Sequence, residues 1–350
     1  MTSKERCFSV LNQEIPDRVP VVPQSFMFSI MDAGLRMGDI NRNGKRMAET
    51  HIRCQEKYGY DGCVIDFDDA SLAEACGARI ILRDDEPAIV DESKPVLKDL
   101  RDVYDLEVPD PLKAGRLPEW IEATRTLVDA IGDYVFIMGR ADQGPFSMAS
   151  LLRGTQQFMV DLMTEDPQVI RDVIAYCRKA CIAFAKAQKD AGAHVTSIGD
   201  ALAGPNLIAP EMYRDFAWEP EKLMADEVQD YGIPLSIHIC GNTVSILPQM
   251  GATGAHILEI DWQVDMGKAR EEIPPDTVLM GNINPSDPMV LGTENDIEDA
   301  VRKIITDTKG KGVFVSTGCA MGRNTPPENF RALIEATKKY GTRELILSMQ

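Results

Sequence analysis

The sequence predicts a single (β/α)8 barrel, an α/β fold in which eight parallel strands form a closed ring and helices cover the outside. Two observations favour this fold class. Eight short apolar runs alternate with longer amphipathic stretches along the chain, which is typical of repeated strand–helix–strand units. No glycine-rich dinucleotide fingerprint accompanies these units, and its absence favours a closed barrel over an open sheet.

The predicted strands are the short apolar runs, many of them rich in Val and Ile. They lie at 19–23, 63–67, 134–138, 194–199, 234–239, 255–260, 277–281 and 312–317. The predicted helices are stretches in which apolar residues recur every three or four positions. They span 43–58, 117–131, 166–191, 209–230, 295–309 and 326–339. No internal repeat or linker interrupts the series, so we expect residues 1–350 to form one domain.

One segment departs from the alternation of strands and helices. Residues 78–97, ARIILRDDEPAIVDESKPVL, contain two apolar runs separated by a polar turn. This pattern predicts a β-hairpin that leaves the barrel near its second unit.

The composition narrows the classes of partner. The formal net charge of −18 and the pI of about 4.7 argue against nucleic acid as a partner, because such a surface repels phosphate backbones. The first twenty residues lack an apolar signal core, and no run of 18 apolar residues occurs. We therefore expect a cytoplasmic protein that does not span a membrane. In that reducing compartment the eight cysteines are expected to serve packing, metal binding or thiol chemistry rather than disulfides.

Polar side chains follow most of the predicted strands, where barrel enzymes build their sites. They are Asp66, Asp68, Arg140, Asp142, Asp200, His238, Cys240, Glu259, Asp261, Asn282, Asn284 and Cys319. A lone aspartate at a strand end is more often a helix cap or a loop brace than a catalyst. The recurrence over many strands nevertheless predicts a site at this end of the barrel.

His238 and Cys240 form the centre of a possible metal site. They are two residues apart on a predicted strand, so both side chains point to the same face. Cys319 follows the last strand and can reach the same mouth, and Glu259 or Asp261 could supply an oxygen ligand. One nitrogen, two sulfurs and one oxygen suit zinc, and ligands drawn from separate strands favour a catalytic site. The alternative is a buried histidine beside two inert cysteines.

Several stretches together resemble the uroporphyrinogen decarboxylase superfamily, along nearly the whole chain. They are MTSKERCFSVLNQEIPDRVPVVP, GPFSMASLLRGTQQFMVDLMTEDPQVIRDVI, GDALAGPNLIAPEMYRDF, IHICGN and DWQVDMGKAR…LMGNINP. The decarboxylases themselves carry an arginine-rich RQAGR stretch after the first strand, and this chain has VPQSFMFSIMDAGLRMGD there. His-x-Cys at 238–240 and STGCAMGRNTP around Cys319 instead resemble the branch of methylcobamide:coenzyme M methyltransferases.

This resemblance implies a (β/α)8 barrel of the uroporphyrinogen decarboxylase type that carries Zn²⁺ and moves methyl groups. The metal ligands would be His238, Cys240, Cys319 and Glu259, since the similar order in cobalamin-independent methionine synthase favours Glu259 over Asp261. Asp200 would be catalytic, and Asp66, Asp142, Asn282 and Asp261 would bind substrate. The alternative for these residues is that they only hydrogen-bond the strand-end loops.

The resemblance also implies partners. No Asp-x-His-x-x-Gly stretch for cobalamin occurs in the chain, so a small cobalamin-binding corrinoid protein would supply the corrinoid or methylcobalamin. A methyl group would pass from methylcobamide to a thiol acceptor, or from a methoxy or methylamine-type donor to cob(I)alamin. A homodimer is possible. One alternative function is decarboxylation of a tetrapyrrole carboxylate with Asp66 or Asp68, and another is a non-catalytic barrel whose zinc only braces the mouth.

Overall fold

The computed structural model describes residues 1–66 and 68–349, and its centre is a sheet of parallel strands. Seven strands follow one another in the order β1-β4-β5-β6-β7-β8-β9. They are β1 (Gly62–Val64), β4 (Phe136–Gln143), β5 (Val195–Gly199), β6 (Leu235–Ile239), β7 (Ile257–Ile260), β8 (Val278–Ile283) and β9 (Val313–Thr317). Every neighbouring pair in this sheet is parallel, as the alternation of strands and helices predicts.

The segment 20–22 closes the sheet into a ring. Val21 forms a parallel bridge with Val315 of β9, and the Val22 amide donates to the Val315 carbonyl. On the other side, the amides of Asp61 and Gly62 donate to the Val21 carbonyl. The predicted barrel is therefore confirmed, but the predicted strand 19–23 forms only a bridge. Pro20 and Pro23 flank it and lack the N–H that a longer ladder needs.

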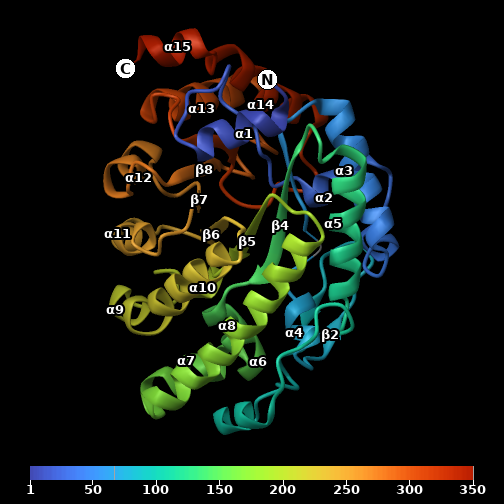
Figure 1. Ribbon diagram of the computed structural model, residues 1–350, viewed down its shortest axis with the longest axis vertical. Helices are drawn as coiled ribbons and strands as arrows, with labels where there is room; N and C mark the ends of the chain where they lie inside the picture. Colours follow the sequence, from blue (N-terminus) through green and yellow to red (C-terminus); the bar gives the residue numbers. More distant parts are fainter. Residues whose placement is uncertain (67, 350) are drawn as a thin grey trace.

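Helices lie around the outside of the strands, and both chain ends lie at the same side of the molecule (Figure 1). The longer ones are α1 (Ser3–Leu11), α3 (Gly44–Tyr58), α5 (Leu117–Ile131), α6 (Pro145–Arg153), α7 (Thr155–Thr164), α8 (Pro167–Asp190), α10 (Glu219–Asp230), α13 (Glu294–Asp307) and α14 (Pro327–Tyr340). The shorter ones are α2 (Phe26–Asp32), α4 (Ser71–Ala75), α9 (Pro210–Met212), α11 (Leu247–Gly251), α12 (Met266–Glu272) and α15 (Arg343–Ser348). Across the described residues, no helix has both the length and the apolar character to cross a membrane.

The six predicted helices correspond to α3, α5, α8, α10, α13 and α14. The predicted helix 209–230 is interrupted by a π-helical segment, Tyr213–Trp218, between α9 and α10. The predicted hairpin is confirmed as an antiparallel pair of β2 (Ile80–Ile81) and β3 (Ile89–Val90). Phe67, the last residue of the predicted strand 63–67, lies outside the described residues.

Side chains alternate along each strand, so the sheet has an outer and an inner face. Those on the outer face, such as Ile137 and Ile237, pack in the large core beneath the helices. Those on the inner face form a separate apolar cluster. Its members are Cys7, Val10, Val22, Val64, Phe136, Met138, Val195, Ile257, Val278, Met280 and Phe314. Because Cys7 and Val10 come from α1, this helix covers the end of the barrel where the strands begin.

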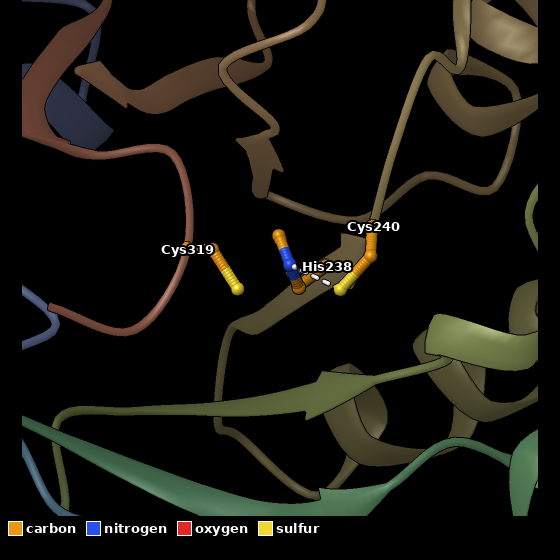
Figure 2. Close-up of side chains that lie close together, drawn as sticks. All are labelled: His238, Cys240 and Cys319. Carbon is orange, nitrogen blue, oxygen red and sulfur yellow. Dashed lines mark hydrogen bonds between the residues drawn. The ribbon is translucent and has the colours of Figure 1, made fainter. Parts of the chain in front are cut away.

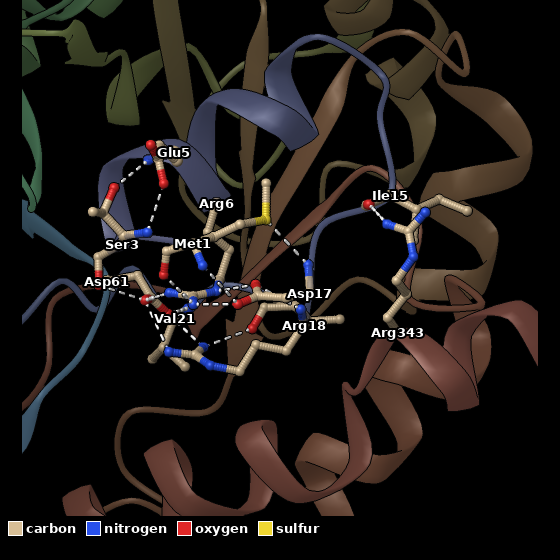
Figure 3. A network of polar contacts seen from close by, with 12 residues as sticks. Met1, Ser3, Glu5, Arg6, Ile15, Asp17, Arg18, Val21, Asp61 and Arg343 are labelled. Carbon is tan, nitrogen blue, oxygen red and sulfur yellow. Dashed lines mark hydrogen bonds and ion pairs between the residues drawn. The ribbon is translucent and has the colours of Figure 1, made fainter.

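A buried ion network ties α1 to that same end (Figure 3). Asp61, which directly precedes β1, is fully buried and accepts hydrogen bonds from the guanidinium groups of Arg6 and Arg18 at 2.7 Å. The Ser3 hydroxyl and the Val21 amide donate to the same carboxylate. Both Asp61 oxygens are therefore satisfied, and the network joins α1, the closing segment and β1.

Candidate metal centre

The inner face of the barrel changes from apolar to polar toward the C-terminal ends of the strands. Above the apolar cluster lie Arg140 on β4, Ser197 on β5, Ser236 and His238 on β6, and Glu259 on β7, all buried. The side chains of His238, Cys240 and Cys319 come together there, with their ligand atoms within 4.8 Å of one another. Figure 2 shows the His238 ring lying between the two cysteine side chains. The predicted convergence of β6 and the loop after β9 is present.

Two glycines allow the cysteine-bearing loops to take these positions. Gly241 follows Cys240 with a φ of 88°, a left-handed conformation that favours glycine. Gly318 precedes Cys319, and a Cβ there would lie 2.3 Å from the backbone nitrogen of Trp262. The loop after β9 can therefore approach the loop after β7 only because residue 318 has no side chain.

The backbone of β7 fixes the orientation of the His238 ring. His238 and Glu259 are register partners on β6 and β7, and His238 Nδ1 lies 3.1 Å from the Glu259 carbonyl oxygen. Because a carbonyl can only accept, Nδ1 carries the hydrogen. In the neutral ring His238 Nε2 then carries the lone pair, and it lies 3.1 Å from Cys240 Sγ. A second-nitrogen bond to a carbonyl is the arrangement that usually orients a metal-binding histidine.

The two thiols shift each other's pKa in opposite directions. A hydrogen bond from the Cys240 thiol lowers the pKa of Cys319, and His238 lowers it further. The same hydrogen bond, together with burial, raises the pKa of Cys240. Burial lowers the pKa of His238, but the contact with Cys319 and the charges of Cys319 and Glu259 outweigh it and raise that pKa. Of the two thiols, Cys319 is therefore the one that gives up its proton more easily.

These three side chains fit a zinc ion. One histidine nitrogen and two cysteine sulfurs are zinc ligands, and bonds of about 2.0 to 2.3 Å place tetrahedral donors about 3.5 to 3.8 Å apart. The observed spread of the donor atoms is within reach of that geometry. Three protein ligands leave a fourth position for a substrate, as in catalytic zinc sites.

Glu259, the predicted fourth ligand, lies beside the cluster with its carboxylate turned to other partners. The Ser236 hydroxyl donates to one oxygen at 2.8 Å, and Arg140 Nη1 lies 3.3 Å from the other. Arg140 also pairs with Asp66 at 3.4 Å and donates to Ser197. The role of Glu259 as a ligand stays a prediction. Arg140 was predicted as one of the polar residues at the strand ends but was given no role, although its spacing from Phe136 and Met138 marks it as inward-facing.

Asp200 is fully buried at the end of β5 and holds the start of α6. Its carboxylate accepts hydrogen bonds from the amides of Ser147 at 2.7 Å and Phe146 at 3.3 Å. Its own amide donates to the His238 carbonyl at 2.8 Å. Burial raises its pKa. Asp200 therefore links α6 to the strand that carries His238, and a catalytic role for it stays a prediction.

Asp66 and Asp142 are buried carboxyl groups with incomplete hydrogen bonding. Oδ1 of each has no hydrogen-bond partner, and Oδ2 of Asp142 accepts from the Leu72 amide. Burial raises the pKa of both well above the usual range, and neighbouring aspartates raise it further. Asp68, in contrast, is paired with Arg116 at 2.5 Å and with the Ser71 hydroxyl. It braces the loop after β1.

Asn282 lies near the end of β8, and Asp261 directly follows β7. The Asn282 side chain donates to the carbonyls of Asp261 and Val264, and Asp261 accepts from the Gln263 amide. Asn282 lines a cavity of about 390 Å³ that α13 also lines, and the three cluster residues do not line it. Substrate binding by these two residues stays a prediction.

Comparison with known proteins places these features in context. The chain matches the family model for uroporphyrinogen decarboxylase over residues 2–340. Methylcobamide:CoM methyltransferase MtbA of Methanosarcina mazei is 28% identical over 344 residues, which are 97% of this chain and 98% of that protein. Methylcobamide:CoM methyltransferase MtaA of Methanosarcina barkeri is 26% identical over 346 residues, with the same coverage. Uroporphyrinogen decarboxylase of Myxococcus xanthus is 27% identical over 309 residues, which are 87% and 85% of the two chains.

Two solved structures extend the comparison. A methyltransferase from Methanosarcina mazei superimposes with a TM-score of 0.89 at 26% identity, covering 97% of this chain and 99% of that one. A B12-independent methionine synthase from Shewanella sp. W3-18-1 has a TM-score of 0.55 at 11% identity, covering 95% and 98%. The second likeness concerns the fold alone.

Proposed function

Because the chain belongs to the uroporphyrinogen decarboxylase family, we propose that it is the corrinoid-dependent, zinc-dependent kind of methyltransferase within that family. It moves a methyl group between a corrinoid on a small partner protein and a small substrate, and the whole chain acts as one barrel domain. The observation that carries the proposal is the cluster of His238, Cys240 and Cys319 at the barrel mouth. The methylcobamide:CoM methyltransferases among its relatives support the choice of reaction.

His238, Cys240 and Cys319 would hold the metal. A zinc ion bound by them would lower the pKa of a substrate thiol and leave its sulfur nucleophilic. The Glu259 carbonyl keeps His238 Nε2 free for that role. Arg140 balances the charge of the Glu259 carboxylate, and burial keeps bulk water away from the histidine. In the thiol direction the substrate would lose its S–H proton and its sulfur would bond the methyl carbon, while the corrinoid of the partner protein would supply the methyl group and keep the electron pair of its cobalt–carbon bond.

Decarboxylation of a tetrapyrrole carboxylate has less support. Such a substrate needs free cations near the entrance, and the stretch 22–39 contains a single arginine, Arg36. Its guanidinium is exposed and pairs with Asp85 at 2.8 Å. Arg140 is already engaged by Glu259 and Asp66. The carboxylate-rich mouth therefore offers little to bind a polyanion.

Metal content tests the proposal first. The purified wild-type protein is expected to contain about one zinc per chain by elemental mass spectrometry. Cys240→Ser and Cys319→Ser are each expected to lose most of it, because a structure with two remaining donors holds zinc weakly. Cys76→Ala is the matched control, since Cys76 is a buried free cysteine outside the cluster. Wild-type protein without zinc, or variants that keep it, would contradict the proposal.

Methyl transfer tests the reaction and its direction. Methylcobalamin, free and on a corrinoid protein, is offered with a panel of thiols, and loss of the methyl group is followed by the absorbance of the corrinoid. Cob(I)alamin is offered with methoxy and methylamine donors in a parallel assay. We expect turnover in one panel, with a loss of more than about 100-fold in Cys319→Ser, since even the groups around a ligand contribute 10- to 100-fold. No turnover in either panel by the zinc-loaded protein would count against a methyltransferase.

A further inference from the structure

The Glu259 side chain leaves the layer of the metal ligands and points deeper into the barrel. The strand register pairs Glu259 with His238, so both side chains start from the same height on the inner face. The register also joins Arg140 to Ser197 and Ser197 to Ser236, which form the next layer toward the strand starts. The Glu259 carboxylate meets Ser236 and Arg140 of this deeper layer. Its side chain is therefore turned away from the mouth.

Both oxygens of the Glu259 carboxylate have partners in the barrel wall. The Ser236 hydroxyl donates to Oε1 at 2.8 Å, and Arg140 Nη1 lies 3.3 Å from Oε2. Glu259 is only 1% exposed, so bulk water does not compete for these oxygens. Among the described residues, the ligand atoms that gather within 4.8 Å of one another are those of the three cluster residues. The Glu259 carboxylate binds the wall instead of joining that cluster.

Arg140 is held in place by more than Glu259. Its Nε lies 3.4 Å from the Asp66 carboxylate, and its Nη1 donates to the Ser197 hydroxyl at 3.2 Å. Arg140 is buried. Burial alone would lower its pKa, but the neighbouring charges, that of Glu259 first, raise it above its ordinary value. A buried guanidinium that is fixed on several sides can hold a carboxylate at a set position.

The charges of the site favour this position of Glu259. A zinc ion bound by two thiolates and one histidine is already formally neutral. Moving the Glu259 carboxylate to such a metal would add a negative charge and take one carboxyl partner from the buried Arg140. Removal of one partner from a buried ion pair is strongly unfavourable, because the remaining charge loses its compensation. The carboxylate would therefore gain little at the metal and lose its pair with Arg140.

We propose that Arg140 is a positioning residue, which holds the Glu259 carboxylate away from the metal and thereby leaves the fourth position open to the substrate. The resting site then has three protein ligands, His238, Cys240 and Cys319, and the substrate displaces no carboxylate. Glu259 acts on the metal site through its backbone carbonyl, which orients His238. This inference rests on the proposed function and deepens it, because it says how the same site admits its substrate.

Cobalt(II) in place of zinc reports the ligands directly. Co²⁺ takes the same nitrogen, sulfur and oxygen donors, and its visible absorption bands change when a ligand is exchanged. Glu259→Gln keeps the shape of the side chain and removes the carboxylate. The cobalt-loaded variant is expected to show the bands of the cobalt-loaded wild type, because no ligand is lost. Shifted bands in this variant would overturn the inference, since they would show that Glu259 binds the metal at rest.

Arg140→Gln removes the residue that holds the carboxylate. Glu259 can then reach the metal, so the bands of bound cobalt are expected to shift. We also expect 2-mercaptoethanol to bind the cobalt-loaded variant at least about tenfold more weakly than the wild type, because the thiol must displace a carboxylate. Unchanged bands, or an unchanged dissociation constant, in a variant that is folded by circular dichroism would contradict the role of Arg140. If the variant does not fold, the spectrum of Glu259→Gln still decides.

Two double variants separate a movement of Glu259 from a general disturbance of the inner face. Arg140→Gln is combined with Glu259→Gln or with Asp66→Asn, so each double variant lacks Arg140 and one of its two carboxyl partners. Only the first lacks the carboxylate that would reach the metal. It is expected to regain the wild-type bands and a thiol affinity within about twofold of the wild type. The second is expected to behave like Arg140→Gln, and equal behaviour of the two would overturn the inference.

The cobalt spectra also separate this inference from the proposed methyl transfer. The expected spectra without turnover in either methyl panel would leave the role of Arg140 standing while the proposed reaction fails. Methyl transfer by a protein whose Glu259→Gln variant shows shifted bands would overturn the inference alone. A wild-type protein that binds neither zinc nor cobalt would overturn both.

Discussion

Two aspartates at opposite ends of β1 show how differently the two ends of this barrel treat a buried charge. Asp61 precedes the strand and is surrounded by donors from Ser3, Arg6, Arg18 and Val21. Asp66 follows the strand and has one ion pair with a shared arginine and one oxygen without a partner. A fully paired buried charge stabilises one arrangement of the chain. An incompletely paired one costs stability, and such groups cluster where a protein binds or reacts.

The largest loss of unfolding free energy is expected from a substitution of Asp61, whose buried carboxylate is fully hydrogen-bonded. Asp61→Asn keeps the shape of the side chain but leaves Arg6 and Arg18 without their shared buried counter-charge. Removing one partner of a buried ion pair costs about 3 to 5 kcal/mol of unfolding free energy. Unfolding in guanidinium chloride, followed by circular dichroism, measures this loss. The zinc content of the folded variant is expected to be unchanged, because the metal cluster lies at the other end of the strands.

Asp17→Asn is the control for that substitution. Asp17 pairs with the same Arg6 at 2.6 Å, but 42% of its side chain is exposed. Exposed ion pairs contribute about 0 to 1 kcal/mol. Equal losses in the two variants would mean that burial of Asp61 does not matter, and the contrast between the barrel ends would then fail.

A smaller effect, confined to the metal cluster, is expected from Gly318→Ala, which should lower the affinity for zinc. The added Cβ would lie 2.3 Å from the Trp262 backbone nitrogen, and a backbone atom cannot yield as a flexible side chain does. The loop must shift and carry Cys319 away from His238. We expect zinc affinity, measured by competition with a chelator, to fall about 10- to 100-fold.

Gly322→Ala serves as the control on the same loop. Its added Cβ would meet a methyl carbon of the Val290 side chain at 3.2 Å, which can yield by a few tenths of an ångström. Its zinc affinity is expected to stay within about twofold of the wild type. If Gly318→Ala binds zinc as well as this control, the close approach of the two loops does not position Cys319.

The contrast between the two ends also shows which features of the fold and of the site could be predicted from the sequence. Strand alternation predicts the barrel and brings His238, Cys240 and Cys319 together, because two-residue spacing and strand order are local properties. The pairing of Arg140 with Glu259 spans 119 positions and depends on which inward side chains meet at one height in the ring. The direction of the Asp200 carboxylate, toward the amides of α6, depends on a helix start that no hydrophobic periodicity reveals. Partners of polar groups are therefore harder to predict than their positions.

The smallest effect on stability is expected from Asp142→Asn. This substitution is expected to stabilise the protein, whereas Asp61→Asn at the other end of the barrel is expected to destabilise it. Burial raises the pKa of Asp142 well above the usual range, so the folded chain binds a proton that the unfolded chain releases above about pH 4. The free energy of unfolding contributed by this group therefore falls as pH rises from there through the folded-state pKa. The amide of the variant still accepts from Leu72 but carries no titrating charge. We expect the variant to be about 1 kcal/mol more stable than the wild type at pH 8, with a smaller difference at pH 5, in urea unfolding at both pH values. An equal loss of stability at both pH values would show that the hydrogen bond from Leu72, rather than the buried charge, dominates at this position. The two ends of the barrel would then be more alike than their hydrogen bonds indicate.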